Sequence, residues 1–502
     1  MTAGNKKALA CIASLLILLV SCGEAASPAG ETPVTAAVTA AETAETSAET
    51  EIFPDLPSDL DFGGKTFTIL CNEYPVPGWT QFDIDAEELN GSTVNDAVFT
   101  RNSAVEEKYN CVIEQLKIDY SQVSSRLKKV VKAGDSSIDI ATPLFWCGGL
   151  ASDLLSGIFF DLNTVSTMKL TNPWYDQMSV RDFQLMDRLY FITSDLTIGD
   201  LIATAGMIFN KKLYDDYGYG GTYGDIYGLV RSGDWTHEAL KSMTLAISGD
   251  LNGDGAMNDL DLYGLLYQRD SLPSFYNAYD MRVADVDQDG MPYYSLITAA
   301  NSVKLDALYS FLYTQNNCFH VMNWFDKTST DFTTGMCNMF MNNQAMFMWI
   351  RFADVEMLRN MDVDFGIIPV PKWDEAQKQY YSAVNQHMGT ATVIPVSCPD
   401  ADTEGYFLEA ICCESMKKLI PAYYEVALQG KITRDEESVD MLDLIFDNRV
   451  YDIGSIFNFG GFGQDMYQLS VTYKSDYASL WAKNESKYQT KLDKFVSDYE
   501  GI

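Results

Sequence analysis

The chain has 502 residues, of which 47% are hydrophobic and 13% aromatic, and its formal net charge is −35. A chain of this length can bury a large core and is expected to form more than one domain. The strong negative charge excludes nucleic acid and anionic membrane surfaces as partners, because like charges repel, and it is typical of a soluble, exported protein.

The first residues have the pattern of an export signal. Lys6 and Lys7 precede an apolar run at 8–20, which is too short for a stable membrane span. The run ends in the letters LVSC at Cys22, which resemble a bacterial lipobox. The pattern predicts a signal peptide at 1–21 and a lipid on Cys22, so that the protein is held at the membrane by this lipid only. An ordinary signal peptide with an incidental cysteine is the alternative.

The segment 22–58 is expected to be a disordered acidic tether. It is rich in Ala, Thr, Glu and Pro, and no Lys or Arg occurs between Lys7 and Lys65. Such a segment cannot bury enough apolar area to fold, so it is predicted to act as a flexible spacer.

Strands and helices alternate over the next part of the chain. The apolar letters KTFTIL at 65–70 predict a strand, and Trp79 follows in the loop after it. A helix with apolar residues on one face comes next, then a strand at 111–118 and a second helix that Gly134 ends. A buried strand then ends at Trp146. This order predicts an α/β lobe with a parallel sheet.

Two later stretches carry a resemblance to a known family. The letters MIFNKKLYDDYG start at Met207, and SGDWTHEAL starts at Ser232. Together with DFGIIPVPK at 364–372 they resemble the extracellular solute-binding proteins of bacterial ABC importers, in the carbohydrate-binding branch. The resemblance implies an α/β, two-lobe fold of the periplasmic-binding-protein type, with a hinge and a ligand cleft between the lobes. It also implies a binding protein that is not an enzyme, with a carbohydrate ligand and ABC permease subunits as partners.

The order of these patterns suggests where the chain crosses between the lobes. The letters MCNMFMNNQAMFMWI resemble a helix of the family that returns to the first lobe. The first lobe is therefore expected at 59–194 and 320–365, and the second lobe at 195–319 and 366–502. Hinges are expected at about Asp195 and Gly366. The segment 421–446 also resembles members of this group, and it has no predicted role beyond helical packing.

One loop carries a metal-binding motif. Its twelve residues run from Asp250 to Asp261 and have the spacing of an EF-hand-type calcium loop. Side-chain oxygens stand at positions one, three, five and twelve, a glycine stands at six, and a backbone carbonyl is available at seven. The predicted calcium ligands are Asp250, Asn252, Asp254, Ala256 and Asp261. A solvated acidic turn is the alternative. A second acidic run at 285–290 has Leu296 at position twelve, which favours a turn between two strands.

Catalytic patterns are absent from the sequence. The three histidines, His237, His320 and His387, lie far apart and have no metal-ligand spacing, which favours packing or hydrogen-bonding roles. Eight cysteines remain in the predicted folded part, and both disulfides and buried thiols fit them. A surface carbohydrate-active hydrolase that uses paired carboxylates is the alternative function. Within the binding class, a peptide or an anionic sugar also fits.

Aromatic side chains near strand ends and crossings are the predicted ligand contacts. Tryptophan faces stack on the C–H faces of a sugar ring, while carboxylates, amides and arginine bind its hydroxyls. The predicted ligand-binding residues are Trp79, Trp146, Trp349, Arg351, Asp195, Asn385 and His387.

Overall fold

The computed structural model describes residues 53–74, 81–146, 149–314, 316–424 and 435–502. The described helices and strands all lie in one compact unit, Asp55–Ile502. The predicted signal peptide, Cys22 and most of the 22–58 segment fall outside the described residues, so they remain predictions. None of the helices among the described residues is both long enough and apolar enough to cross a membrane.

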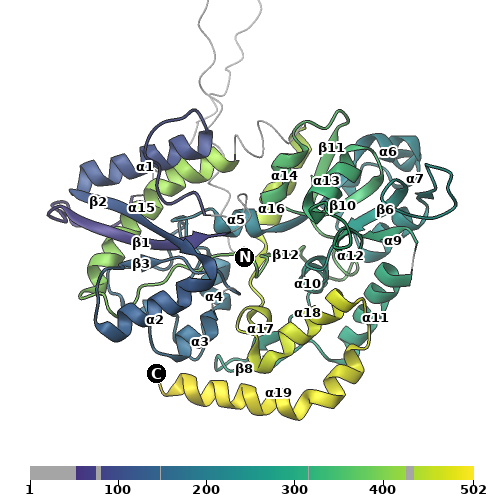
Figure 1. Ribbon diagram of the computed structural model, residues 1–502. Coiled ribbons are helices and arrows are strands. Elements are labelled where there is room, and N and C mark those ends of the chain that lie inside the picture. The colour runs from purple at the N-terminus through teal and green to yellow at the C-terminus, as the bar shows by residue number, and fades with distance from the viewer. Residues whose placement is uncertain (1–52, 75–80, 147–148, 315, 425–434) are drawn as a thin grey trace, which may run out of the picture. The chain divides into compact units, whose positions relative to one another are not determined.

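The first lobe is built on a parallel three-stranded sheet (Figure 1). Strand β1 (Lys65–Glu73) lies in the middle, between β2 (Cys111–Asp119) and β3 (Ile140–Ala141). Figure 1 shows α1 (Thr93–Tyr109) on one side of this sheet and α2 (Val123–Ala133) on the other. The predicted strand–helix–strand–helix–strand order is therefore confirmed. Helix α2 ends, as predicted, at a glycine in the left-handed conformation, which a residue without Cβ adopts at little cost.

The second lobe has a larger mixed sheet. Its strand order is β11-β4-β10-β6-β5, and β9 also pairs with β6. Strand β10 is antiparallel to β4 and parallel to β6. The strands are β4 (Ala205–Asn210), β5 (Ser248–Gly249), β6 (Leu262–Tyr267), β9 (Cys318–His320), β10 (Ala345–Arg351) and β11 (Phe365–Ile368).

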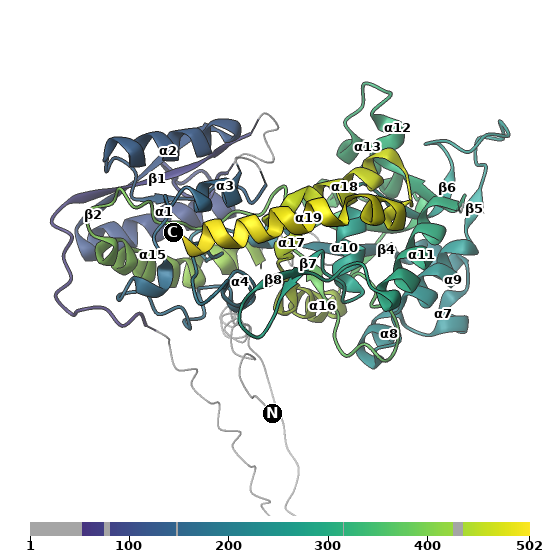
Figure 2. The same cartoon turned by 90° about the horizontal axis from the view of Figure 1, so that it is seen from below.

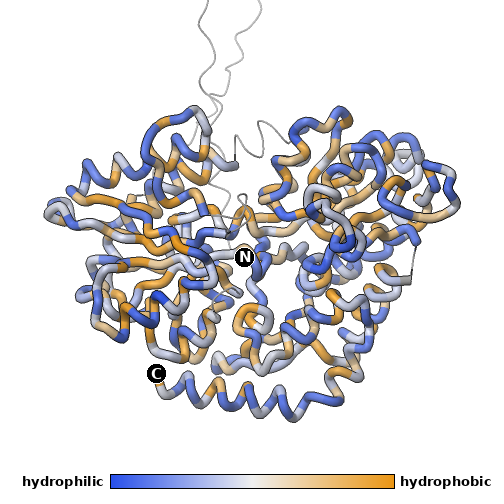
Figure 3. The backbone as a smooth tube through the Cα atoms, viewed as in Figure 1, coloured by the Kyte–Doolittle hydropathy of each residue, from blue (hydrophilic) through white to orange (hydrophobic). Residues whose placement is uncertain are grey.

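Both faces of the second sheet are covered. Along β10, Phe347 and Trp349 belong to the core on one face, whereas Met348 and Ile350 belong to the core on the other. Side chains alternate between the faces of a strand, so a strand with two covered faces reads as one continuous apolar run. Figure 3 shows this as predominantly orange strands at the centre of each lobe.

The lobe boundaries differ from those predicted. The segment 320–365, expected in the first lobe, contains β10, which lies between β4 and β6 in the second sheet. An apolar run of this kind fits the middle of either sheet, so its pattern did not identify its lobe. Conversely, α15 (Ala401–Pro421), expected in the second lobe, packs on α1, and Phe407 stacks on Phe67 of β1 with ring centroids 4.0 Å apart.

The chain crosses between the lobes at segments that lie side by side. Thr204, just before β4, forms a bridge with Val384. Strand β12 (Ser382–Ala383) pairs in parallel with β13 (Arg449–Val450). The predicted hinge at Asp195 precedes the first crossing by a few residues. The predicted hinge at Gly366 is wrong, because this residue lies inside β11 and pairs with Phe209 of β4.

The last helix contacts both lobes. Helix α19 (Tyr477–Glu500) buries Tyr477 and Tyr488 in the second-lobe core and Phe495 and Tyr499 in the first-lobe core. Figures 1 and 2 both show it running from one lobe to the other. The backbone carbonyl of Tyr499 accepts a hydrogen bond from Arg188 Nη1 at 3.0 Å. The lobes are therefore joined by α19 as well as by the crossing segments.

The remaining elements complete both lobes. The acidic run at 285–290 forms the predicted turn, here between β7 (Ala284–Val286) and β8 (Pro292–Tyr294). Seven cysteines among the described residues are buried thiols. The other helices include α3 (Leu150–Leu155), α4 (Gln177–Asp182), α5 (Gly199–Ala203), α6 (Lys211–Asp216), α7 (Tyr219–Tyr223), α8 (Ile226–Ser232), α9 (His237–Leu245), α10 (Ser271–Ala278), α11 (Ala299–Thr314), α12 (Val321–Phe325), α13 (Phe332–Met341), α14 (Phe352–Val355), α16 (Glu436–Asp447), α17 (Ile453–Ile456) and α18 (Phe462–Thr472).

Candidate functional site

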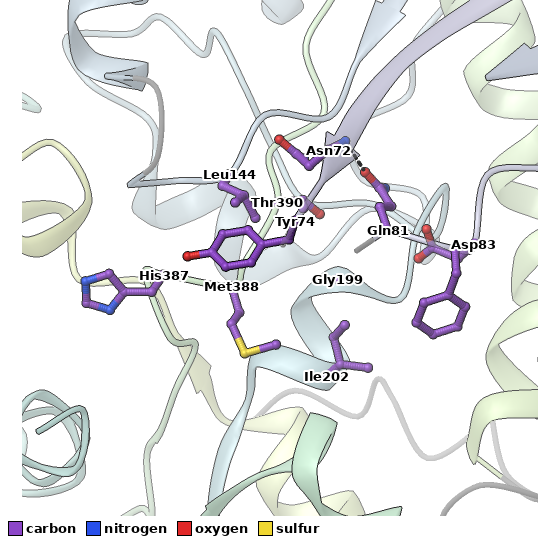
Figure 4. A pocket seen from close by; sticks show the side chains of 11 residues that line it. Asn72, Tyr74, Gln81, Asp83, Leu144, Gly199, Ile202, His387, Met388 and Thr390 are labelled. Atoms are coloured by element: carbon purple, nitrogen blue, oxygen red, sulfur yellow. Dashed lines mark hydrogen bonds between the residues drawn. The ribbon is translucent and has the colours of Figure 1, made fainter. Parts of the chain in front are cut away.

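Two cavities meet at His387, beside the crossing segments. The first has an empty volume of about 450 Å³ and is lined from the first lobe by Asn72, at the end of β1, and by residues after β1 such as Asp83 (Figure 4). The second has an empty volume of about 350 Å³ and is lined by residues of α10 and α17, together with Asp270 and Asn385. His387 lines both cavities, so it stands where the two lobes face each other.

Local hydrogen bonds position the segment that carries His387. The backbone N–H of Asn385 donates to the carbonyl of Ala203 at 2.9 Å, and the side-chain Oδ1 of Asn385 accepts from the backbone N–H of His387 at 2.8 Å. Two residues on, a Cβ at Gly389 would lie 2.5 Å from the ring of Phe145. Only glycine therefore fits at this position, and the chain passes close to the first lobe immediately after His387.

Asp270 is the charged centre of the second cavity. Its Oδ2 accepts a hydrogen bond from Asn385 Nδ2 at 3.0 Å, and its Oδ1 lies 3.5 Å from His387 Nδ1. Arg351 Nη1 is 3.8 Å from Oδ2. Burial alone raises the pKa of Asp270, but His387, Arg351 and Asn385 outweigh it and hold the pKa well below its usual range. The carboxylate is therefore ionised and fixes Asn385 and His387 in place.

Aromatic rings from both lobes contact His387. Trp146 of the first lobe and Tyr467 of α18 each have a ring centroid 4.9 Å from that of His387. Trp146 is 43% exposed, so much of its ring is available to a ligand. Of the predicted ligand residues, Asn385 and His387 thus line the second cavity, and Trp146 lines neither cavity but lies against His387.

Two other predicted contacts are buried. Trp349 is fully buried in the second-lobe core and lines neither cavity. Its position on β10, between two covered faces, explains why the prediction of a cleft position is wrong. Arg351 is 1% exposed and binds Asp354 through Nε at 2.9 Å and Nη2 at 2.7 Å. Its contact with Asp270 links it to the site. Trp79 lies outside the described residues.

Asp195 lies beside a separate cluster of charged residues around Arg449 of β13. Arg449 Nη2 lies 2.6 Å from Asp176 Oδ2, and its Nη1 lies 3.1 Å from Asp200 Oδ2. Burial raises the pKa of Asp195 well above its usual range, with Asp200 adding to the rise and Arg449 opposing it. Burial also raises the pKa of Asp200 to about 6. The predicted ligand contact at Asp195 is therefore a residue of the hinge region that lines neither cavity.

The other two histidines have packing roles, as predicted. Burial lowers the pKa of His237 and of His320 to about 4 in each case. His237 Nδ1 lies 2.6 Å from the hydroxyl of Tyr279, which fixes the ring in the second-lobe core.

Sequence reasoning missed several residues of the site. Asn72 and Asp83 give little signal, because polar residues after a strand are common. Asp270 has the clearest sequence signal of these residues, since an aspartate directly before the letters SLPSF is typical of a helix start. Tyr467 is one of 29 tyrosines, and nothing in its neighbourhood distinguishes it.

The acidic loop at 250–261 folds on its own side chains. Asp250 accepts hydrogen bonds from the backbone N–H groups of Gly253 and Gly255, and Asp261 accepts from those of Leu251 and Asn258. Among the described residues, no group of three or more His, Cys, Asp or Glu side chains is placed to hold a metal ion. Calcium binding would require these carboxylates to turn toward one point, so it remains a prediction for Asp250, Asn252, Asp254, Ala256 and Asp261.

Comparison with known proteins identifies the fold. No family model matches the sequence, and no curated protein matches it. Among solved structures, UspC of M. tuberculosis has a TM-score of 0.53 at 12% identity, covering 86% of this chain and 100% of that chain. An ABC transporter solute-binding protein from Agrobacterium radiobacter in complex with ribitol has a TM-score of 0.52 at 12% identity, covering 86% and 99%. A cyclo/maltodextrin-binding protein complexed with maltotetraose has a TM-score of 0.52 at 13% identity, covering 87% and 96%. The predicted two-lobe, periplasmic-binding-protein-like α/β fold is thus confirmed.

Proposed function

We propose that this chain, which has the fold of ABC-importer binding proteins, captures a sugar or an oligosaccharide and delivers it to an ABC permease outside the cytoplasmic membrane. The observation that carries the proposal is the pair of cavities that meet at His387 between the lobes. A ligand held there contacts both lobes, and a permease that recognises the paired lobes can then distinguish loaded protein from empty protein.

The chemistry of the cleft supports a saccharide. Trp146 and Tyr467 offer aromatic faces to the apolar C–H faces of a sugar ring. Asp270, Asn385 and His387 offer polar groups at the same place, where hydroxyls on the edge of the ring require hydrogen-bond partners. This combination of flat apolar surfaces and convergent polar groups suits a polyhydroxylated ring better than an extended peptide.

The structural neighbours give independent support at the level of fold. Two of them are complexes with maltotetraose and ribitol, so the same fold holds polyhydroxylated compounds in other proteins. The lipobox-like motif at Cys22 and the acidic segment after it support a lipid-anchored protein whose binding lobes are held away from the membrane surface.

Calcium in the 250–261 loop is part of the proposal as a structural ion. The support is the spacing of oxygen-bearing residues in the sequence, together with positive φ angles at Gly253 and Gly255, which give the loop its tight turn. The ion would stabilise a loop of the second lobe and would have no direct contact with the cleft residues described above.

Binding and turnover of a glycan panel test the proposal. Neutral and acidic oligosaccharides are incubated with the protein, binding is measured by calorimetry, and the glycans are then analysed for cleavage. Saturable binding with unchanged glycan is the expected result. His387→Ala should weaken that binding about tenfold or more by removing a contact common to both cavities, whereas Gln379→Ala, which changes an exposed side chain, should not.

Two results would overturn the proposal. Cleavage of a glycan would favour the alternative, a surface hydrolase that uses paired carboxylates in the cleft. Binding of a peptide library together with failure to bind any glycan would show that the cleft serves another class of solute.

A further inference from the structure

Three buried polar atoms at one end of the first cavity have no hydrogen-bond partner. They are Asn72 Oδ1, Gln81 Nε2 and Asp83 Oδ1. Asn72 is 1% exposed and Asp83 is 2% exposed, and all three residues line the cavity. Figure 4 shows the three side chains near the end of β1, with the ring of Tyr74 between them and His387.

The other polar atom of each side chain is already held by the protein. Asn72 Nδ2 donates to the carbonyl of Thr142 at 2.5 Å, and Gln81 Oε1 accepts from the hydroxyl of Thr142 at 2.8 Å. Asp83 Oδ2 accepts from the backbone N–H of Ile198 at 2.6 Å. The protein therefore fixes the orientation of each group through one atom and leaves the second atom unpaired.

Unpaired buried polar atoms are costly, and proteins rarely keep them without a reason. A buried donor or acceptor that gives up its water without a new partner destabilises the folded state. The Gln81 side chain lies beside Asp83 and stabilises its charged form, but Gln81 Nε2 and Asp83 Oδ1 are not in hydrogen-bond geometry. Burial also raises the pKa of Asp83, although the Ile198 N–H and Arg101 oppose the rise. Three such atoms beside one cavity indicate a ligand that supplies the missing partners.

We propose that Asn72, Gln81 and Asp83 form a hydroxyl-binding subsite that accepts one ring of an uncharged saccharide. The proposal rests on the proposed function and specifies the chemical class of its ligand. Sugar hydroxyls donate to Asn72 Oδ1 and Asp83 Oδ1, and one hydroxyl oxygen accepts from Gln81 Nε2. Tyr74 and the 45% exposed Phe82 line the same cavity and offer ring faces to the C–H groups of the sugar.

Charge determines which saccharides the subsite accepts. Among the described residues that line the two cavities there is no Lys or Arg, whereas Asp83, Asp270 and Asp452 all contribute carboxyl groups. Arg351, the cation beside Asp270, is already bound to Asp354. A uronic acid or a sialylated sugar would bring its own carboxylate to these groups without a cation to pair it, so acidic saccharides are rejected.

Isosteric substitutions test the three atoms without changing the shape of the cavity. Gln81→Glu replaces the unpaired donor with an acceptor, and Asp83→Asn replaces the unpaired acceptor with a donor. The double variant D83N/Q81E exchanges donor and acceptor and keeps the number of carboxylates, so a loss in it is not a loss of charge. Gln489→Glu on the exposed face of α19 is the matched control. Each variant is compared with the wild type by calorimetry and by melting temperature.

We expect the wild-type protein to bind neutral oligosaccharides more tightly than acidic oligosaccharides of the same length. Q81E, D83N and the double variant should each bind the best neutral oligosaccharide about 10- to 100-fold more weakly, with melting temperatures within a few degrees of wild type. The control variant should bind like the wild type. A purely structural role would instead lower the melting temperature and leave the affinity of the folded protein unchanged.

The remaining outcomes also decide the question. Neutral glycans that bind all variants equally, or acidic glycans that bind best, overturn the subsite and leave the proposed function intact. If no glycan binds at all, the proposed function fails, and crystals soaked in ribitol then test the subsite alone. Electron density for ribitol at Asn72, Gln81 and Asp83, absent in crystals of D83N/Q81E, would show that these residues bind hydroxyls. An empty first cavity would refute the subsite.

Discussion

Trp146→Ala should weaken saccharide binding strongly and leave the fold almost unchanged. The side chain is 43% exposed in the ligand-free protein. A tryptophan can bury up to about 250 Å², so a ligand that covers the exposed part of the ring removes up to about 110 Å² from water. At about 25 cal/mol/Å² this area is worth up to about 2.7 kcal/mol, or about an 80-fold change in Kd. Partial coverage gives about 1.5 kcal/mol, which we take as the lower bound.

The assay is calorimetric titration of the best saccharide, paired with thermal unfolding of the free protein. Tyr293→Ala is the matched control, because Tyr293 is 46% exposed and lies on β8, whereas Trp146 lies against His387. The contact between Trp146 and His387 contributes a further small loss, since His387 is then less restrained. An affinity for W146A within twofold of wild type, with an unchanged melting temperature, would show that the ligand does not cover this ring.

Three further predictions concern stability and motion. If the loop binds calcium, EDTA should lower the melting temperature and added calcium should restore it. The double variant Asp250→Ala with Asp254→Ala should not respond to either. An unchanged melting temperature in EDTA, with no calcium in the purified protein, would show that the loop is only a turn. Burial raises the pKa of Asp200 from 3.8 to about 6, with Arg449 opposing, so the folded state binds this proton more tightly than the unfolded state does. The free energy of unfolding contributed by Asp200 therefore falls as pH rises from about 4 to 6, and Asp200→Asn should remove that part of the slope; parallel pH profiles of urea unfolding would contradict this. Because α19 joins both lobes, Phe495→Ala should increase the radius of gyration of the ligand-free protein in small-angle scattering. Saccharide should reduce the radius of gyration of both wild type and variant. Identical scattering profiles of the two ligand-free proteins would show that α19 does not restrain the lobes.

The strands and helices of the first lobe follow from local sequence. KTFTIL and CVIEQLKI predict strands, and they form β1 and β2 in parallel register from Lys65 and Cys111 onward. Gly134 ends α2 because a left-handed cap requires a residue without Cβ. These features depend on neighbours within a few residues along the chain, which is why they can be read without a structure.

Membership of a lobe depends on contacts between distant parts of the chain. The run AMFMWI fits the centre of any covered sheet, and only its pairing with β4 places Trp349 in the second-lobe core. In the same way, α15 joins the first lobe because Phe407 stacks on Phe67, 340 residues earlier. Apolar periodicity shows that a segment is buried, but it does not show which partner buries it.

At the candidate site, too, the sequence indicates some features and only the tertiary structure decides others. Sequence alone indicated aromatic and polar residues near the crossings. Of these, Asn385 and His387 line the second cavity, and Trp146 contacts the ring of His387. Tertiary structure decided that Asp270 holds Asn385 and His387, because an aspartate before a helix acquires that role only when the crossing segment folds back onto it. Burial and hydrogen-bond partners are properties of the assembled fold, so the residues whose function depends on them become visible only once the lobes have come together.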